Sequence, residues 1–147
     1  MTVIAYKDGL MAADTQSWHI GIRHAEAVKI VRLPDGSLFG AAGWQPEIER
    51  AQNWLANGAD PTIRPAKAEE ADLEGILLKP DGSVWTVAHT FDVYRTNATT
   101  DAVGSQKEFL YGAMAAGASA EEAVRLAIKC CGNAGGDVQV MRLNDGN

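Results

Sequence analysis

Short apolar runs recur along this chain of 147 residues, and residues that favour turns separate them. Runs of this length are typical of β-strands, and an Asp-Gly pair between two of them is a strong short-range signal for a β-hairpin. Three Asp-Gly pairs, at residues 8–9, 35–36 and 81–82, predict hairpins over residues 2–15, 29–42 and 75–88.

Three other segments carry apolar residues at helical spacing. Pro46 stands at the first position of one of them and Gly58 just beyond its end, which is the usual asymmetry of helix termini. Ser119 begins a capping box, a frequent start of a helix. The predicted helices cover residues 47–57, about 105–116 and 119–131, and a last strand covers residues 137–143.

The order of these elements predicts a layered α+β fold in a single domain over residues 1–147. Strands outnumber helices and are mostly antiparallel, while the helices are amphipathic, so helices can cover the outer faces of stacked sheets. A chain of this length typically buries about 68–70% of its unfolded surface and needs no disulfide or metal for stability.

The net charge of −6, from 13 Lys and Arg against 19 Asp and Glu, argues against a nucleic-acid-binding surface. No apolar run approaches the roughly 20 residues that span a bilayer, and no charged-then-apolar leader stands at the start. We therefore expect a soluble, cytoplasmic protein. The adjacent Cys130 and Cys131 fit neither a disulfide framework nor zinc spacing, and no metal or other cofactor is expected.

The first hairpin begins unusually early, at Thr2. Removal of Met1 would give Thr2 a hydroxyl and a free α-amine together, an arrangement that activates a threonine as a nucleophile. The α-amine has an ordinary pKa of about 7.7–8.0, which suits a general base. A two-residue turn would place Thr2 opposite Thr15, and a three-residue turn would place it opposite Asp14. Either register brings Asp14 close to Thr2.

Five short fragments follow one another along the chain: Thr2-Val3-Ile4-Ala5, Ala12-Ala13-Asp14-Thr15, Lys29-Ile30, Ala41-Ala42-Gly43 and Val103-Gly104-Ser105. In order and approximate spacing they resemble the proteasome β-type subunits and the bacterial HslV-type peptidases. The resemblance extends to the Gly135-Gly136 turn and the final strand. It implies the four-layer αββα sandwich of N-terminal nucleophile (Ntn) hydrolases and a threonine peptidase.

The resemblance also implies a role for individual residues. Thr2 would be the nucleophile, Lys29 a cation beside its hydroxyl, and Asp14 the carboxylate that holds Lys29. The backbone N–H of Gly43 would form the oxyanion hole; losing such a donor typically costs about 10²–10³ in rate. Ser105 would hydrogen-bond near the α-amine, although a serine at that position is equally well explained as a helix N-cap.

The expected substrate pocket lies near Ser17, Ala27 and Ala41, and the small Ala41 indicates a roomy pocket. Because members of the family form stacked rings, the resemblance implies a homo-oligomeric ring, peptide or unfolded-protein substrates, and a possible ATPase unfoldase partner. Three residues are candidate ring contacts: Trp44, Trp54 and Phe109.

Two other functions fit the same resemblance. One is an Ntn amidase acting on a small amide, and the other is a non-catalytic, proteasome-like assembly protein. Retention of Met1 would favour the assembly protein, because it blocks the α-amine. The sequence also departs from the family pattern. The first hairpin is shorter by about two residues per arm, Gln106 stands where glycine is frequent, and residues 131–133 stand where an aspartate often supports the serine.

Overall fold

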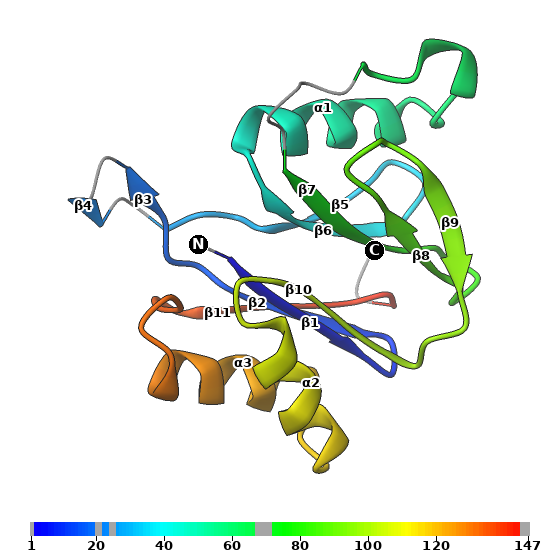
Figure 1. Ribbon diagram of the computed structural model, residues 1–147. Helices are drawn as coiled ribbons and strands as arrows, with labels where there is room; N and C mark the ends of the chain where they lie inside the picture. Colours follow the sequence, from blue (N-terminus) through cyan, green and yellow to red (C-terminus); the bar gives the residue numbers. More distant parts are fainter. Residues whose placement is uncertain (1, 20–21, 24–25, 67–71, 145–147) are drawn as a thin grey trace.

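The computed structural model of the protein describes residues 2–19, 22–23, 26–66 and 72–144. These residues form antiparallel sheets with helices packed against them (Figure 1). In chain order the elements are β1 (Val3–Lys7), β2 (Leu10–Asp14), β3 (Trp18–His19), β4 (Ile22–Arg23), β5 (Ile30–Arg32), β6 (Leu38–Gly43), α1 (Gln45–Ala56), the 3-10 turn η1 (Pro61–Ile63), β7 (Leu73–Leu78), β8 (Val84–Val87), β9 (Val93–Thr96), β10 (Thr100–Gly104), α2 (Lys107–Ala115), α3 (Ala120–Cys130) and β11 (Val138–Arg142).

The described strands build two larger sheets and one small hairpin. The first sheet has the order β10-β1-β2-β11, the second has the order β5-β6-β7-β8-β9, and β3 pairs with β4. The paired strands run antiparallel. The predicted α+β class with antiparallel strands is therefore confirmed.

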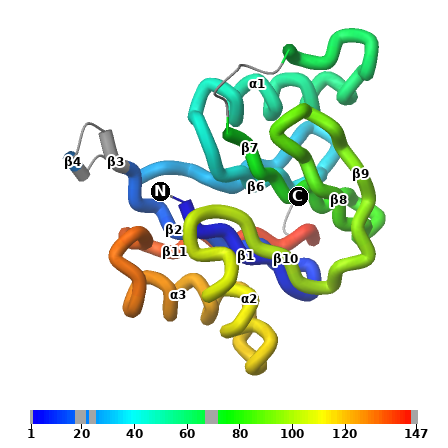
Figure 2. The backbone as a smooth tube through the Cα atoms, viewed as in Figure 1, coloured from blue at the N-terminus to red at the C-terminus, as the bar shows by residue number. Residues whose placement is uncertain are grey.

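Apolar side chains of the described residues gather in three clusters. One joins the first sheet to α2 and α3, the second joins the two sheets, and the third joins the second sheet to α1 (Figures 1 and 2). Strand β1 is buried on both faces: Val3 and Ala5 face the helices, whereas Ile4 and Tyr6 face the second sheet. This follows from the two-residue period of a strand.

The first hairpin closes with a two-residue turn. Lys7 pairs with Leu10, and the turn residues Asp8 and Gly9 both have positive φ, at 51° and 79°, as a type I′ turn requires. Continuing this register places Thr2 opposite residue 15, so the two-residue alternative from the sequence is the correct one. Asp14 nevertheless contacts the start of β1, because its Oδ1 accepts a hydrogen bond from the backbone N–H of residue 3 at 3.1 Å.

The three predicted helices are present with ends shifted by one or two residues. Helix α3 is capped by Ser119, whose Oγ accepts a hydrogen bond from the N–H of Glu122 at 3.1 Å. Helix α2 begins at Lys107 with Gln106 as its N-cap residue, so the alternative of Ser105 as the N-cap is wrong. No helix among the described residues is long and apolar enough to cross a membrane.

The crossing of the chain from the second sheet to the first escaped the sequence analysis. The sequence indicated only extended chain after β8, but β9 continues the second sheet and β10 then pairs with β1 along its whole length. The pairing sets Gly104 opposite Val3. Residues 103–105 therefore lie beside the start of the chain, although about a hundred positions separate them in sequence.

Trp54, expected to be a ring contact, belongs to the core. It is 7% exposed, it packs edge-on against Phe91 with ring centroids 6.3 Å apart, and its indole N–H donates to the carbonyl of Asp60 at 2.9 Å. Its place on the buried face of α1 explains the error. Phe109 is partly buried against the core, whereas Trp44 is 54% exposed.

The cap of α3 allows a direct test of the helix boundary. Replacing Ser119 by alanine leaves the N–H of Glu122 without its side-chain acceptor, and such a loss typically costs about 0.5–2 kcal/mol. We expect a decrease of that size in the free energy of unfolding, measured with urea. Ser119→Asp, which keeps an acceptor, should stay within a few tenths of a kcal/mol. Equal losses in both variants would show that the cap contributes nothing.

Candidate active site

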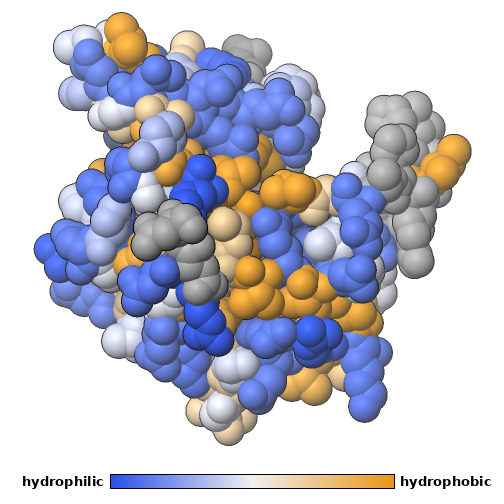
Figure 3. All heavy atoms as spheres, turned by 180° about the vertical axis from the view of Figure 1, so that it is seen from behind, coloured by the Kyte–Doolittle hydropathy of each residue, from blue (hydrophilic) through white to orange (hydrophobic). Residues whose placement is uncertain are grey.

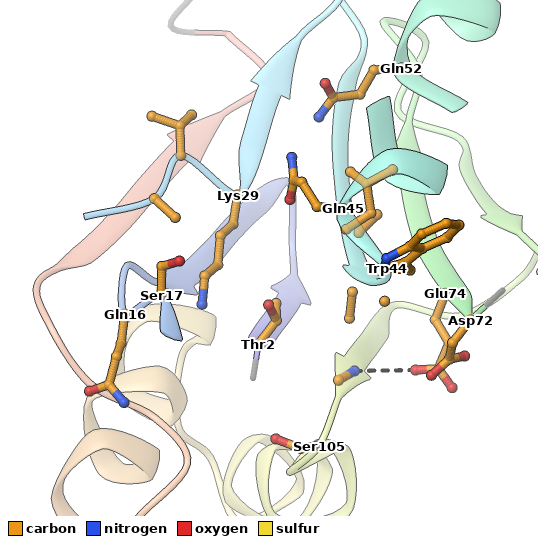
Figure 4. Close-up of a pocket in the computed structure, with 17 residues that line it drawn as sticks. Thr2, Gln16, Ser17, Lys29, Trp44, Gln45, Gln52, Asp72, Glu74 and Ser105 are labelled. Atoms are coloured by element: carbon orange, nitrogen blue, oxygen red, sulfur yellow. Dashed lines mark hydrogen bonds between the residues drawn. The ribbon is translucent and has the colours of Figure 1, made fainter. Parts of the chain in front are cut away.

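A cavity of about 750 Å³ opens around Thr2 (Figure 4). Its walls come from the ends of β6 and β10, the start of α1, and the segments before β5 and β7. Thr2 and the long side chain of Lys29 point into the same part of it (Figure 4). The sequence-predicted site residues that line the cavity are Thr2, Ser17, Ala27, Lys29, Ala41, Gly43 and Ser105.

Asp14 is not among the residues that line the cavity, but it pairs with Lys29, which is. Its carboxylate is fully buried at the end of β2, and Oδ1 is 2.7 Å from Nζ of Lys29, whose side chain is 8% exposed. The same Oδ1 accepts from the N–H of Val3, and Oδ2 accepts from the N–H of Gly135 at 3.2 Å. A buried carboxylate needs such partners to offset its lost hydration, and these partners fix its position.

The protonation of Lys29 is shifted by its surroundings. Burial lowers the pKa of Lys29 from its ordinary value, because desolvation disfavours the ammonium form; the hydrogen bond and charge of Asp14 act in the opposite direction without cancelling it. A lysine with a lowered pKa gives up its proton at a lower pH than a solvated lysine does. Shifts of this kind are typical of residues at functional sites.

Residues 104 and 105 hold the main chain of Thr2. The N–H of Ser105 donates to the carbonyl of Thr2 at 3.1 Å, and Gly104 has a φ of +107°. A Cβ at Gly104 would clash with the carbonyl oxygen of Thr2, so only glycine allows β10 to approach this closely. Ser105 therefore contacts Thr2 through its backbone. Gly104 also belongs to the site, although the sequence analysis named it only as part of a family fragment and gave it no role.

Gly43 lies at the end of β6 and lines the cavity. The next residue, Trp44, donates its N–H to the carbonyl of Asp72 at 2.9 Å. On the other side of β6 lies β5. On that side β5 begins only at Ile30, which pairs with Gly40, so the ladder ends before it reaches Gly43.

Gly43 must itself be glycine. Its φ is +135°, and a Cβ would clash with the carbonyl oxygen of Asp72.

The wall opposite Lys29 is acidic and was missed from the sequence. Glu74 accepts from the N–H of Gly104 at 3.2 Å, drawn as the dashed line in Figure 4, and pairs with Nζ of Lys107 at 2.7 Å. The hydrogen bond and charge of Glu74 raise the pKa of Lys107. Asp72 and Trp44 line the same side of the cavity. The sequence pattern of β7 did not predict a functional role for Glu74 or Asp72, because charged residues at strand ends are common. Among the described residues no group of three His, Cys, Asp or Glu is placed to hold a metal ion.

The Asp14–Lys29 pair should carry much more stability than an exposed pair does. Asp14→Asn removes the carboxylate charge from the buried pair with Lys29, and breaking such a pair typically costs about 3–5 kcal/mol. The matched control is Asp92→Asn, which removes the exposed pair with Arg64 and should cost about 1 kcal/mol or less. Urea unfolding at pH 7 measures both. Similar losses would contradict the buried geometry.

The pKa of Lys29 predicts a pH dependence of stability. Its folded-state pKa lies below the ordinary 10.5, so between the two values the unfolded chain binds more protons and the free energy of unfolding rises with pH. We expect wild-type stability, taken relative to Lys29→Met, to increase as the pH approaches 10.5. Chemical unfolding of both proteins from pH 7 upward tests this. A relative stability that falls over that range would contradict the direction of the shift.

Comparison with known proteins places the fold. No protein-family model and no curated protein matches the sequence. BPH from Thiobacillus denitrificans in complex with epoxomicin is 21% identical, with a TM-score of 0.67 over 97% of this chain and 98% of that one. A second structure of BPH is 22% identical, with a TM-score of 0.64 over 98% of both chains. Eukaryotic HslV from Trypanosoma brucei is 20% identical, with a TM-score of 0.65 over 97% of this chain and 99% of that one. The chain therefore shares its fold with HslV- and proteasome-like peptidases, as its sequence fragments implied.

Proposed function

We propose that this chain is a threonine-type peptidase subunit with the αββα sandwich of Ntn hydrolases, and that Thr2 becomes its nucleophile once Met1 is removed. Met1 itself lies outside the described residues. The observation that carries the proposal is that Thr2 and Lys29 line one cavity, and that Lys29 pairs with the buried carboxylate of Asp14.

The proposed reaction is acyl transfer through an ester of Thr2. The hydroxyl oxygen attacks the peptide carbonyl while the α-amine of the same residue takes its proton, and the Lys29 charge favours the developing alkoxide. The N–H of Gly43 donates to the oxyanion of the tetrahedral intermediate. The α-amine then protonates the leaving amine. Water next attacks the ester, the α-amine again relays the proton, and the hydroxyl of Thr2 is regenerated.

Substrate side chains would enter the space lined by Ser17, Ala27 and Ala41. All three line the cavity beside Thr2, and the alanines leave room there because their side chains are a single methyl group. Gln45 and Gln52 point into the same space from α1 (Figure 4). The pocket therefore combines small apolar walls with two amides, which suits an uncharged side chain next to the cleaved bond.

A homo-oligomeric ring is the proposed state of the protein, with peptide or unfolded-protein substrates and an ATPase unfoldase as a possible partner. The support is a set of large apolar side chains left on the surface. The hairpin β3–β4 extends away from both sheets (Figure 1) with Ile22 67% exposed, and Val28 and Trp44 are 73% and 54% exposed. Figure 3 shows further hydrophobic residues among hydrophilic ones on the face seen from behind. Val28 and Trp44 lie around the same cavity; single exposed apolar residues are common, whereas contiguous apolar patches are typical of interfaces.

The role of Thr2 can be tested with epoxomicin, the compound bound in the BPH complex. We expect intact mass to show loss of Met1, one epoxomicin adduct per chain located on Thr2, and cleavage of fluorogenic peptides. Thr2→Ala should abolish the adduct and lower kcat by at least about 10³-fold, because the nucleophile is gone. Thr15→Ala is the matched control; its hydroxyl donates to the carbonyl of Asp137, and it should keep the adduct.

Three outcomes would contradict the proposal or replace it. Undiminished cleavage by Thr2→Ala would show that another group is the nucleophile. Retention of Met1 without any adduct would favour the non-catalytic assembly protein. Hydrolysis of small amides without peptide cleavage would favour the amidase.

A further inference from the structure

Gln139 in the last strand contacts the backbone of Lys29 from outside the cavity. Its Oε1 accepts from the N–H of Lys29 at 2.9 Å and from the N–H of Ile30 at 3.0 Å, and its Nε2 donates to the carbonyl of Ile30 at 2.7 Å. The oxygen and the nitrogen of the Gln139 amide therefore both hydrogen-bond to the backbone of residues 29 and 30. The residues that line the cavity do not include Gln139, and the reaction proposed above gives it no role.

The side chain of Gln139 occupies a position where the strand pattern calls for an apolar residue. Along β11, Val138 and Val140 pack with the cluster on the helix side of the first sheet, whereas Met141 and Leu143 pack with the cluster between the two sheets. Gln139 shares the second face, because side chains alternate along a strand. A polar amide on that face needs hydrogen-bond partners, and it finds them at the edge of the second sheet.

The contact changes the course of the chain at Lys29. In an extended strand successive N–H groups point to opposite sides, yet the N–H groups of Lys29 and Ile30 converge on one oxygen. The chain therefore leaves strand geometry at this point. This agrees with the start of β5 at Ile30 and with the end of the β5–β6 ladder before it reaches Gly43.

The same strand pair also fixes the partner of Lys29. In the pairing of β11 with β2, Gln139 stands opposite Ala13 and Val138 stands opposite Asp14. The side chain of Lys29 is thus tied to β2 through Asp14, while its backbone is tied to β11 through Gln139. Both ties come from adjacent positions of one rigid ladder, which sets where Nζ can lie relative to Thr2.

We propose that Gln139 is a positioning residue for Lys29: its amide anchors the backbone at the start of β5, so that the Lys29 side chain reaches Asp14 beside Thr2. The inference rests on the proposed function where it speaks of catalysis. Its structural half, the anchoring of residues 29 and 30, is independent of any activity.

The alternative explanation is a purely structural role, in which Gln139 joins the two sheets without positioning Lys29. The chain offers a matched comparison, because Arg32 at the other end of β5 also reaches the end of β11. Its guanidinium donates to the carbonyls of Arg142 at 2.6 Å and Leu143 at 3.1 Å. Arg32→Met removes this second link without touching Lys29, and Gln139→Met removes the first link while keeping the length of the side chain.

Steady-state peptide hydrolysis by the full-length protein separates the two explanations. We expect Gln139→Met to lower kcat by about 10- to 100-fold with KM within about twofold, because a small misplacement of a catalytic group costs this much. Arg32→Met should leave kcat within about twofold. Gln139→Glu keeps an acceptor for both N–H groups but loses the donor to the Ile30 carbonyl, so its kcat should lie between those of Gln139→Met and the wild type. An equal fall of kcat in Arg32→Met, or an unchanged kcat in Gln139→Met, would overturn the proposal.

Amide hydrogen exchange tests the anchor without relying on activity. In Gln139→Met the amides of Lys29 and Ile30 should exchange at least about tenfold faster than in the wild type, while Arg32→Met keeps them protected. Unchanged protection in Gln139→Met would overturn the inference whatever the protein catalyses. If the wild-type protein cleaves no peptide but Gln139→Met still loses the protection of these amides, the anchor is upheld and the proposed function is rejected.

Discussion

A buried carboxylate at the end of the second strand is the constraint on which the rest of the site depends. Asp14 has no solvent contact, and it meets the Lys29 ammonium, the start of β1 and the turn before β11 at once. Burying a charge in this way is unfavourable unless every partner is held in place. The fold meets that condition by drawing its partners from three separate stretches of the chain, all converging beside Thr2.

The two sheets have different parts in this arrangement. The first sheet supplies Thr2 and Asp14, and β10 closes on its edge so tightly that only Gly104 fits beside Thr2. Lys29 comes directly before β5 of the second sheet, and Gly43 stands at the end of β6. The β5–β6 ladder ends at the pair Ile30–Gly40, so Gly43 lies beyond the end of this ladder. The side-chain amide of Gln139 binds the backbone at this end of the ladder.

The sequence predicted the parts of this structure that local chemistry determines. Asp8-Gly9 specified a tight turn, Pro46 and Gly58 bounded a helix, and Ser119 capped another, because each acts on its own neighbours. The crossing of β10 to β1 depends on contacts between distant segments, and no local pattern encodes it. For the same reason Glu74 and Gln139 were missed, since both act through backbone groups of remote strands. Trp54 was misplaced because an aromatic residue on an amphipathic helix is equally consistent with a core and with an interface.

The most direct test of the central claim is the pKa of the Thr2 α-amine, followed by NMR titration in the wild type and in Lys29→Met. If the Lys29 charge lies beside an unblocked Thr2, it disfavours the protonated amine. The wild-type amine should then titrate below the ordinary range of about 7.7–8.0, and Lys29→Met should return it towards that range. The same pKa in both proteins, or no titratable amine on Thr2 at all, would contradict the account.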